Sequence, residues 1–259
     1  MIKLAQIQYS PLLGDINGNP SRVKTLLSEC KEPELIILPE LSDTGYNFPN
    51  KKYALKQSMP IDDNPFINLL LNHATKYKSH LVSGFCEKRN KKLFNSSILI
   101  GPDGILGIYQ KIHLFMNEKD IFSEGSGGLL VYDLGDYKLG MQICFDYLFP
   151  EPWNILAHHE ADIIAHPSNL VTHNAFKVIP ALSVINKVFI ATTNRMGSDA
   201  GLLFAGKSFL SNPNGEIIST ASESKEEILI TEFEPAISRN KMITSRNHVF
   251  KDRRPDKYK

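Results

Sequence analysis

Residues 35–41 read LIILPEL, a run of four apolar residues that ends in a proline and a carboxylate. The run predicts a buried β-strand, and Pro39 predicts its end, because proline has no N–H to offer a sheet ladder. Glu40 would then lie at the rim of a sheet, where α/β enzymes place their sites. Taken alone, the segment favours a Glu40 that caps a turn or faces water.

Short apolar runs recur along the whole chain and predict many further strands. They span residues 2–7, 81–85, 97–100, 105–109, 129–132, 139–143, 163–165, 188–192, 208–210, 217–219 and 228–231. Helical patterns alternate with them at residues 19–30, 64–73 and 175–187. Asn19 and Asn64 each precede a proline and are plausible N-caps, whereas Pro180 makes the start of the third helix uncertain. The mixture favours a layered α/β fold, and no composition break divides residues 1–259 into separate domains.

Charge and cysteine content narrow the class of protein. The formal net charge is +1, from 29 basic and 28 acidic residues, which gives no reason to expect nucleic acid or an anionic membrane as a partner. The basic tail at residues 251–259 contains two aspartates and predicts a solvated terminus.

Three scattered cysteines argue against a disulfide framework. The opening MIKLAQIQYS lacks the features of a secretion signal, and no apolar run approaches the ~20 residues of a membrane helix. We therefore expect a cytoplasmic protein.

Two further segments place reactive residue types next to predicted strands. Residues 109–115 read YQKIHLF, so Lys111 directly follows a strand-like run; surface exposure is the commonest fate of a lysine, and His113 suits a hydrogen-bonded structural role. Residues 139–147 read LGMQICFDY, so an apolar strand runs into Cys144. A cysteine on a strand-to-helix turn is well placed as a nucleophile, because the turn exposes the sulfur and lets backbone N–H groups point at the reacting carbonyl. The alternative for Cys144 is a small buried hydrophobe.

Together the three segments resemble the nitrilase superfamily of carbon–nitrogen hydrolases. LPEL around Glu40, YQKIHLF around Lys111 and CFDYLFPE around Cys144 follow its order, with gaps of 71 (111 − 40) and 33 (144 − 111) residues. The segment FSEG places Glu124 where the superfamily carries an additional active-site glutamate. The opening QYSPLLGDINGN and the segments HPSN (166–169), TTNRMG (192–197), FAGKSFLSNPNGEII (204–218) and DRRPDKY (252–258) also resemble it, so the likeness spans nearly the whole chain.

The resemblance implies a fold and a chemistry. The fold is a four-layer α-β-β-α sandwich, which in relatives commonly pairs into a homodimer or a larger homo-oligomer. Cys144 would be the nucleophile, Glu40 the general base and Lys111 the neighbouring cation, with Glu124 in support and with no metal or cofactor. The expected reaction is hydrolysis of a small linear amide through a thioester, with release of ammonia.

Candidate substrate-binding residues follow from the same resemblance. Tyr46, Asn169 and Asn194 would line the site, and the backbone N–H of Phe145 would donate to an oxyanion. Arg195 could bind a substrate carboxylate, although an internal salt bridge is the alternative. One position departs from the pattern CYDxRFPE of many relatives, because Leu148 stands where they carry arginine.

The same residues are compatible with other functions. Alternative enzymatic reactions are hydrolysis of an N-carbamoyl amine or N-carbamoyl amino acid, and then hydrolysis of a nitrile. A papain-like hydrolase would use Cys144 with His113 or His166, and a catalytically silent scaffold would keep the fold alone. A zinc hydrolase is disfavoured, because the histidine pair before Glu160 lacks the second histidine of HExxH.

Overall fold

The computed structural model describes residues 1–258, so Lys259 of the basic tail lies outside the described residues. Its centre is formed by two six-stranded mixed sheets. The first has the order β14 (Glu227–Phe233), β1 (Ile2–Gln8), β2 (Leu35–Ile37), β3 (His80–Arg89), β4 (Lys92–Gly101) and β5 (Gly104–Gln110). The second has the order β13 (Ile217–Thr220), β12 (Phe209–Ser211), β9 (Phe189–Asn194), β8 (Ile163–Ser168), β7 (Lys138–Met141) and β6 (Val131–Asp133). The middle strands β1, β2 and β3 are parallel, as are β7, β8 and β9, and the flanking strands pair antiparallel.

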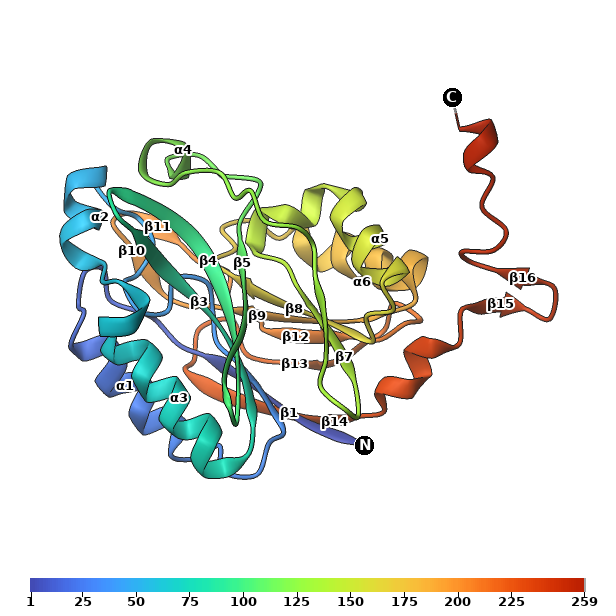
Figure 1. Cartoon of the computed structure of the whole chain (residues 1–259), viewed down its shortest axis with the longest axis horizontal. Helices are drawn as coiled ribbons and strands as arrows, with labels where there is room; N and C mark the ends of the chain where they lie inside the picture. Colours follow the sequence, from blue (N-terminus) through green and yellow to red (C-terminus); the bar gives the residue numbers. More distant parts are fainter. Residues whose placement is uncertain (259) are drawn as a thin grey trace.

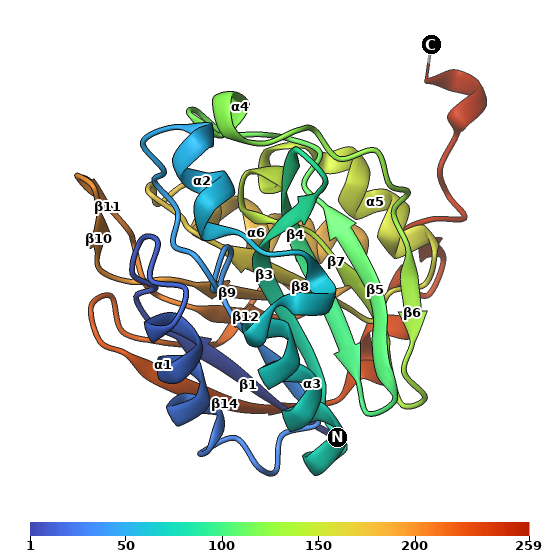
Figure 2. The ribbon, with the colours of Figure 1, turned by 60° about the vertical axis from the view of Figure 1, so that its left-hand side comes forward.

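Helices cover the outer face of each sheet (Figure 1, Figure 2). The first sheet packs on α1 (Gly18–Leu27) and α3 (Pro65–Tyr77), whose apolar faces share one core with its strands. The second packs on α5 (Pro150–His158) and α6 (Ala175–Asn186). These layers confirm the predicted α-β-β-α sandwich. Two short helices, α2 (Lys51–Gln57) and α4 (Glu118–Ile121), lie beside one another at one end of the first sheet (Figure 2).

The predicted helix starts are right in one case and wrong in the other. Asn64 caps α3, with its side-chain oxygen accepting from the Phe66 N–H at 2.9 Å. Asn19, predicted as an N-cap, instead lies inside α1 and is buried. Its amide exchanges hydrogen bonds with Leu12 and donates to the Asp43 carbonyl, so it holds two loops together.

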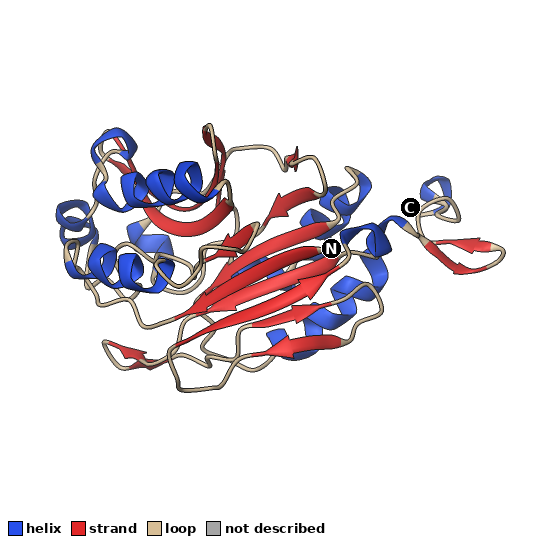
Figure 3. Ribbon diagram, turned by 90° about the horizontal axis from the view of Figure 1, so that it is seen from below, coloured by secondary structure: helices blue, strands red, loops and turns tan. Residues whose placement is uncertain are grey.

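The two sheets face one another across a continuous apolar core, and a few polar side chains cross it. Gln6 of β1 donates from Nε2 to the carbonyl of Thr192 at 2.9 Å and to that of Phe209 at 3.2 Å, both in the second sheet. After β14 the chain passes through a short 3₁₀ helix (Pro235–Arg239) to a hairpin of β15 (Met242–Thr244) and β16 (Asn247–His248). Figure 3 shows this hairpin standing away from both sheets. The remaining paired strands are β10 (Ser198–Asp199) and β11 (Leu202–Leu203).

Candidate active site

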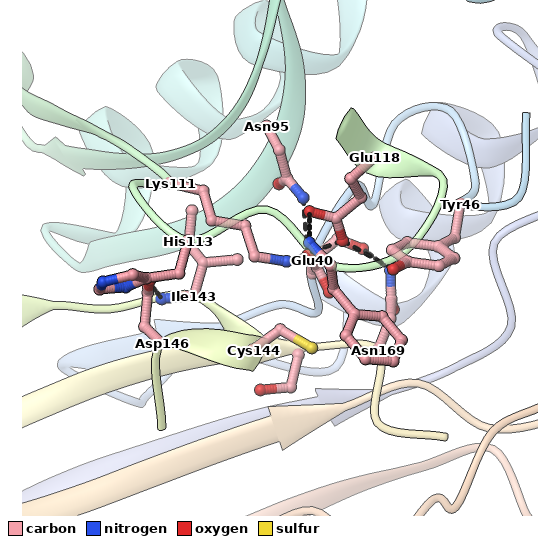
Figure 4. A network of polar contacts seen from close by, with 12 residues as sticks. Glu40, Tyr46, Asn95, Lys111, His113, Glu118, Ile143, Cys144, Asp146 and Asn169 are labelled. Atoms are coloured by element: carbon pink, nitrogen blue, oxygen red, sulfur yellow. Dashed lines mark hydrogen bonds and ion pairs between the residues drawn. The ribbon is translucent and has the colours of Figure 1, made fainter. Parts of the chain in front are cut away.

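Glu40 and Lys111 meet at the end of the first sheet. Glu40 follows β2 and Lys111 follows β5, and the side chains of both residues are fully buried. Lys111 Nζ lies 2.7 Å from Glu40 Oε1, and Asn95 Nδ2 donates to the same oxygen at 2.6 Å (Figure 4). Gly84 of β3 permits this placement, because a Cβ there would lie 2.4 Å from Glu40 Cα.

A second carboxylate completes the surroundings of Lys111, and it belongs to Glu118 rather than to Glu124. Lys111 Nζ donates to Glu118 Oε1 at 2.8 Å, and the Tyr46 hydroxyl donates to the same oxygen at 2.6 Å. Glu124, predicted to lie beside Lys111, is exposed, so its predicted position is wrong. The physical reason is that α4 turns Glu118 inward, whereas the chain beyond Phe122 runs out along the surface.

Cys144 begins a tight 3₁₀ turn (Cys144–Leu148) shortly after β7. Its φ is +42°, in the left-handed region that non-glycine residues rarely adopt and that often marks functional sites. Figure 4 shows its sulfur pointing toward Glu40, below Lys111. The structure therefore brings the three predicted residues together around one thiol.

The electrostatics of the site keep the thiol protonated and the lysine charged. Burial raises the pKa of Cys144 well above its ordinary value, and the Glu40 carboxylate adds to this, while Lys111 opposes it. Burial disfavours the ammonium of Lys111, but the Glu118 and Glu40 carboxylates outweigh burial and hold its pKa above the ordinary value. Burial also raises the pKa of Glu118. The thiol therefore needs a base at the moment of attack, and Glu40 is a carboxylate in position for that role.

The turn that carries Cys144 is anchored by Asp146, which sequence reasoning missed. Asp146 Oδ2 accepts from the Ile143 N–H at 2.9 Å and from the Tyr109 hydroxyl at 2.8 Å. His113 Nδ1 lies 2.8 Å from Oδ1 of the same carboxylate, and its ring stacks on Phe149 at 3.6 Å between centroids. A carboxylate beside its turn is a common pattern, so the sequence offers no sharp signal for this role.

His166 likewise hydrogen-bonds to the backbone of Cys144 and not to its sulfur. Its Nε2 lies 2.9 Å from the Cys144 carbonyl oxygen, which can only accept, so Nε2 carries the proton. Its Nδ1 then accepts from the Thr192 hydroxyl at 3.0 Å. Burial lowers the pKa of His166 to about 4, so the ring is neutral. Both histidines of the papain-like alternative therefore have other partners than the thiol.

A cavity of about 160 Å³ opens beside Cys144. Its apolar wall consists of Phe115, Phe145, Tyr147, Leu148, Leu170 and Val171. The remaining lining is neutral and polar, from Asn169, Thr172 and Asn174. Leu148, the departure from the family pattern, lies at its mouth with 47% of its surface exposed.

The predicted substrate-binding residues occupy different places. Phe145 and Asn169 line the cavity, and Asn169 Nδ2 also donates to the Glu40 carbonyl at 3.0 Å. Tyr46 is buried, its hydroxyl donates to Glu118, and it does not line this cavity. The prediction that Asn194 lines the pocket is wrong. Its side-chain amide accepts from the Leu170 N–H and donates to the Gly206 carbonyl, and so fixes two loops.

Residues 3–240 match the carbon–nitrogen hydrolase family, so the chain belongs to that family and is a carbon–nitrogen hydrolase. Among similar proteins is a nitrilase from Pyrococcus abyssi, 40% identical over 260 residues that cover 100% of this chain and 99% of the relative. An N-carbamoylputrescine amidase from Arabidopsis thaliana is 28% identical, covering 95% of this chain and 90% of the relative. The solved structure of Nit3 from Saccharomyces cerevisiae, a member of the nitrilase superfamily, is 26% identical and covers 92% of each chain with a TM-score of 0.82.

No helix of residues 1–258 is both long and apolar enough to cross a membrane. Within the same residues, no group of three or more histidine, cysteine or acidic side chains is arranged to hold a metal ion.

Proposed function

We propose that this hydrolase cleaves the C–N bond of a small linear amide through a thioester on Cys144 and releases ammonia. The observation that carries the proposal is the buried pair of Glu40 and Lys111, 2.7 Å apart, beside the Cys144 thiol at the wall of a cavity. A general base, a fixed cation and a nucleophile are the groups that acyl transfer requires.

Formation of the thioester uses Glu40 first as a base and then as an acid. Glu40 accepts the thiol proton as sulfur attacks the amide carbonyl, and the oxyanion is stabilised by the Lys111 ammonium and the backbone N–H of Phe145. The tetrahedral intermediate collapses and the C–N bond breaks. Glu40 gives its proton to the leaving nitrogen, which departs as ammonia.

Hydrolysis of the thioester repeats the sequence with water as the nucleophile. Glu40 deprotonates the water as it attacks, and the C–S bond breaks when the second intermediate collapses. The proton on Glu40 returns to sulfur, so the enzyme is restored and the products are a carboxylic acid and ammonia. Glu118 holds Lys111 between two carboxylates throughout.

Ammonia release from a panel of amides, N-carbamoyl compounds and nitriles tests the proposal. We expect amides to be the best substrates and Cys144→Ala to be inactive. Lys111→Ala should lower kcat/KM by about 10²–10³-fold, because an oxyanion donor is lost, whereas His113→Ala should be mild. A severe His113→Ala with a mild Lys111→Ala would favour a Cys–His hydrolase. Equal release by the wild type and Cys144→Ala would favour a silent scaffold.

We also propose that the enzyme is a cytoplasmic homo-oligomer. Three free cysteines support a reducing compartment. The outer face of α5 and α6 exposes Ile155 and Ile185, which supports pairing of two copies through these helices. Light scattering on the purified protein should give at least twice the 29.1 kDa mass of one chain; a monomer would contradict this.

A further inference from the structure

The lining of the cavity beside Cys144 contains no charged side chain among residues 1–258. Lys111 donates to two carboxylates. Arg195, a candidate for binding a substrate carboxylate, is buried and pairs with Asp199 at 3.3 Å, and it also donates to the Pro11 carbonyl.

Leu148 extends the same neutral character to the mouth of the cavity. An arginine at this place would offer a substrate carboxylate a planar pair of donors. Here an isobutyl group occupies the position, and Phe145 continues the apolar wall, with its ring 4.9 Å from that of Phe115. A charged substrate group packed against this apolar wall would lose hydration and gain no opposite charge.

The volume of the cavity also favours a small substrate. An apolar cavity of about 150 Å³ accommodates a molecule as large as benzene, that is, about six non-hydrogen atoms. The cavity of about 160 Å³ therefore suits an amide with a short acyl chain.

We infer that the substrates of this enzyme carry an uncharged, mainly apolar acyl group of about four carbons. The inference rests on the proposed amide hydrolysis and specifies its substrate class. It separates this enzyme from hydrolases whose substrates end in an amine or a carboxylate, such as N-carbamoylputrescine, which the Arabidopsis thaliana relative is named for.

Three amides with four carbons each test the charge preference: neutral butyramide, anionic succinamate and cationic 4-aminobutyramide. We expect the kcat/KM of the full-length enzyme for butyramide to exceed the other two values by at least about 100-fold, since an unpaired charge in a neutral cavity is strongly disfavoured. Equal or faster turnover of either charged amide would overturn the inference.

Binding to the Cys144→Ala variant, measured by calorimetry, separates this inference from the proposed reaction. Binding of butyramide but not of succinamate, combined with no ammonia release by the wild type, would contradict the proposed function and support the assignment of a neutral site. Binding of succinamate as tight as that of butyramide would sink the neutral-site assignment, whatever the wild type hydrolyses.

A charge introduced at the cavity mouth gives the complementary test. Leu148→Arg should raise the ratio of kcat/KM for succinamate over butyramide by at least about 10-fold, because the new cation pairs with the carboxylate. Ile105→Arg is the matched control: this residue is similarly exposed, at 42%, and lies at the far end of β5, about 20 Å along the strand from Lys111. An equal shift in both variants, or none in Leu148→Arg, would contradict the position given to Leu148.

Discussion

Lys111 lies between two carboxylates, and this arrangement explains how an ammonium is kept charged in a fully buried site. Removing one charge from water costs several kcal/mol, and the nearby Glu40 and Glu118 oxygens offset that cost. Only one of these carboxylates is then free to exchange a proton with the thiol. Glu118 is bound to Tyr46 and Lys111, so we assign it to positioning and Glu40 to proton transfer.

This assignment predicts unequal effects of two similar substitutions. Glu118→Gln removes a negative charge from Lys111 and should lower kcat by about 10- to 100-fold, because the ammonium is no longer held in place. Glu124→Gln, at the exposed position first expected to do this work, should change kcat less than about twofold. Steady-state ammonia release measures both. Comparable losses in the two variants would contradict the placement of Glu118.

His166 gives the protein a specific sensitivity to acid. The unfolded chain protonates this ring near pH ~6.5, whereas in the fold its pKa is about 4. Between these values the unfolded state binds more protons, so stability falls as pH drops through this window, by up to about 3 kcal/mol.

Urea unfolding followed through Trp153, which packs on His166, tests this prediction. The free energy of unfolding of His166→Gln should depend less on pH between about 6.5 and 4 than that of the wild type. His159→Gln, at an exposed ring, is the control and should behave as the wild type. Identical pH dependence in all three proteins would rule out His166 as the source.

Sequence and structure agree best where a reactive residue lies within three positions of the end of a strand. Glu40, Lys111 and Cys144 all meet this description, and the family spacing links them. Glu118 could not be found this way, because it belongs to a four-residue helix with no periodic pattern. The prediction for Asn194 is wrong because the resemblance of its segment TTNRMG to the family does not reveal which loop atoms its amide meets.

At the level of secondary-structure elements, one carboxylate joins the turn of Cys144 to the strand that leads to Lys111. Tyr109 and His113 flank Lys111 at two residues on either side, and both contact Asp146. Asp146 in turn holds the N–H of Ile143, next to Cys144. The nucleophile and the lysine are therefore set in register by a shared anchor, although they come from different sheets.

Asp146→Asn should disturb this register. Its amide retains one accepting oxygen, so one of three hydrogen bonds to a charged group is lost, at about 1.5–3 kcal/mol of stability. We expect kcat to fall by about 10- to 100-fold with KM changed little, since misplaced groups slow the chemical step more than binding. Asp133→Asn, in an exposed position at the end of β6, is the matched control. If both variants keep wild-type kcat, Asp146 has no positioning role.

Element boundaries followed from the sequence only in part. The strand predicted over residues 35–38 appears as β2, and Pro180 is accommodated inside α6. Helices α2 and α4 were not expected, because each is short and lacks an apolar period. Asparagine before proline is a usual start signal and predicts that α1 begins at Asn19. The Asn19 side chain instead donates hydrogen bonds to the carbonyls of Leu12 and Asp43.

At the scale of the whole molecule, the active site depends on how the two sheets are aligned. Glu40 and Lys111 extend from the first sheet, whereas Cys144 extends from the second. The pairing of β1 with β14 joins residues more than 200 positions apart, so periodicity alone could not give the sheet order. The four layers were predicted from family resemblance, and the composition only permitted them.

Gln6 is a candidate for fixing that alignment, because its amide bonds to the backbone of β9 and β12 across the core. Gln6→Leu would leave buried carbonyl oxygens without this donor and should cost about 1–3 kcal/mol of stability. Glu232→Gln, on the exposed side of the neighbouring β14, serves as the control. Urea unfolding of both variants should show a loss for Gln6→Leu alone, and equal stability would contradict the role.

The covalent intermediate tests the central claim most directly. Wild-type enzyme mixed with butyramide, quenched in acid within one turnover and digested, should yield a peptide in which Cys144 carries one butyryl group. Lys111→Ala should give much less of this adduct, and Cys144→Ala should give none. Ammonia release without any acyl group on Cys144, or an acyl group found on another residue, would contradict the account.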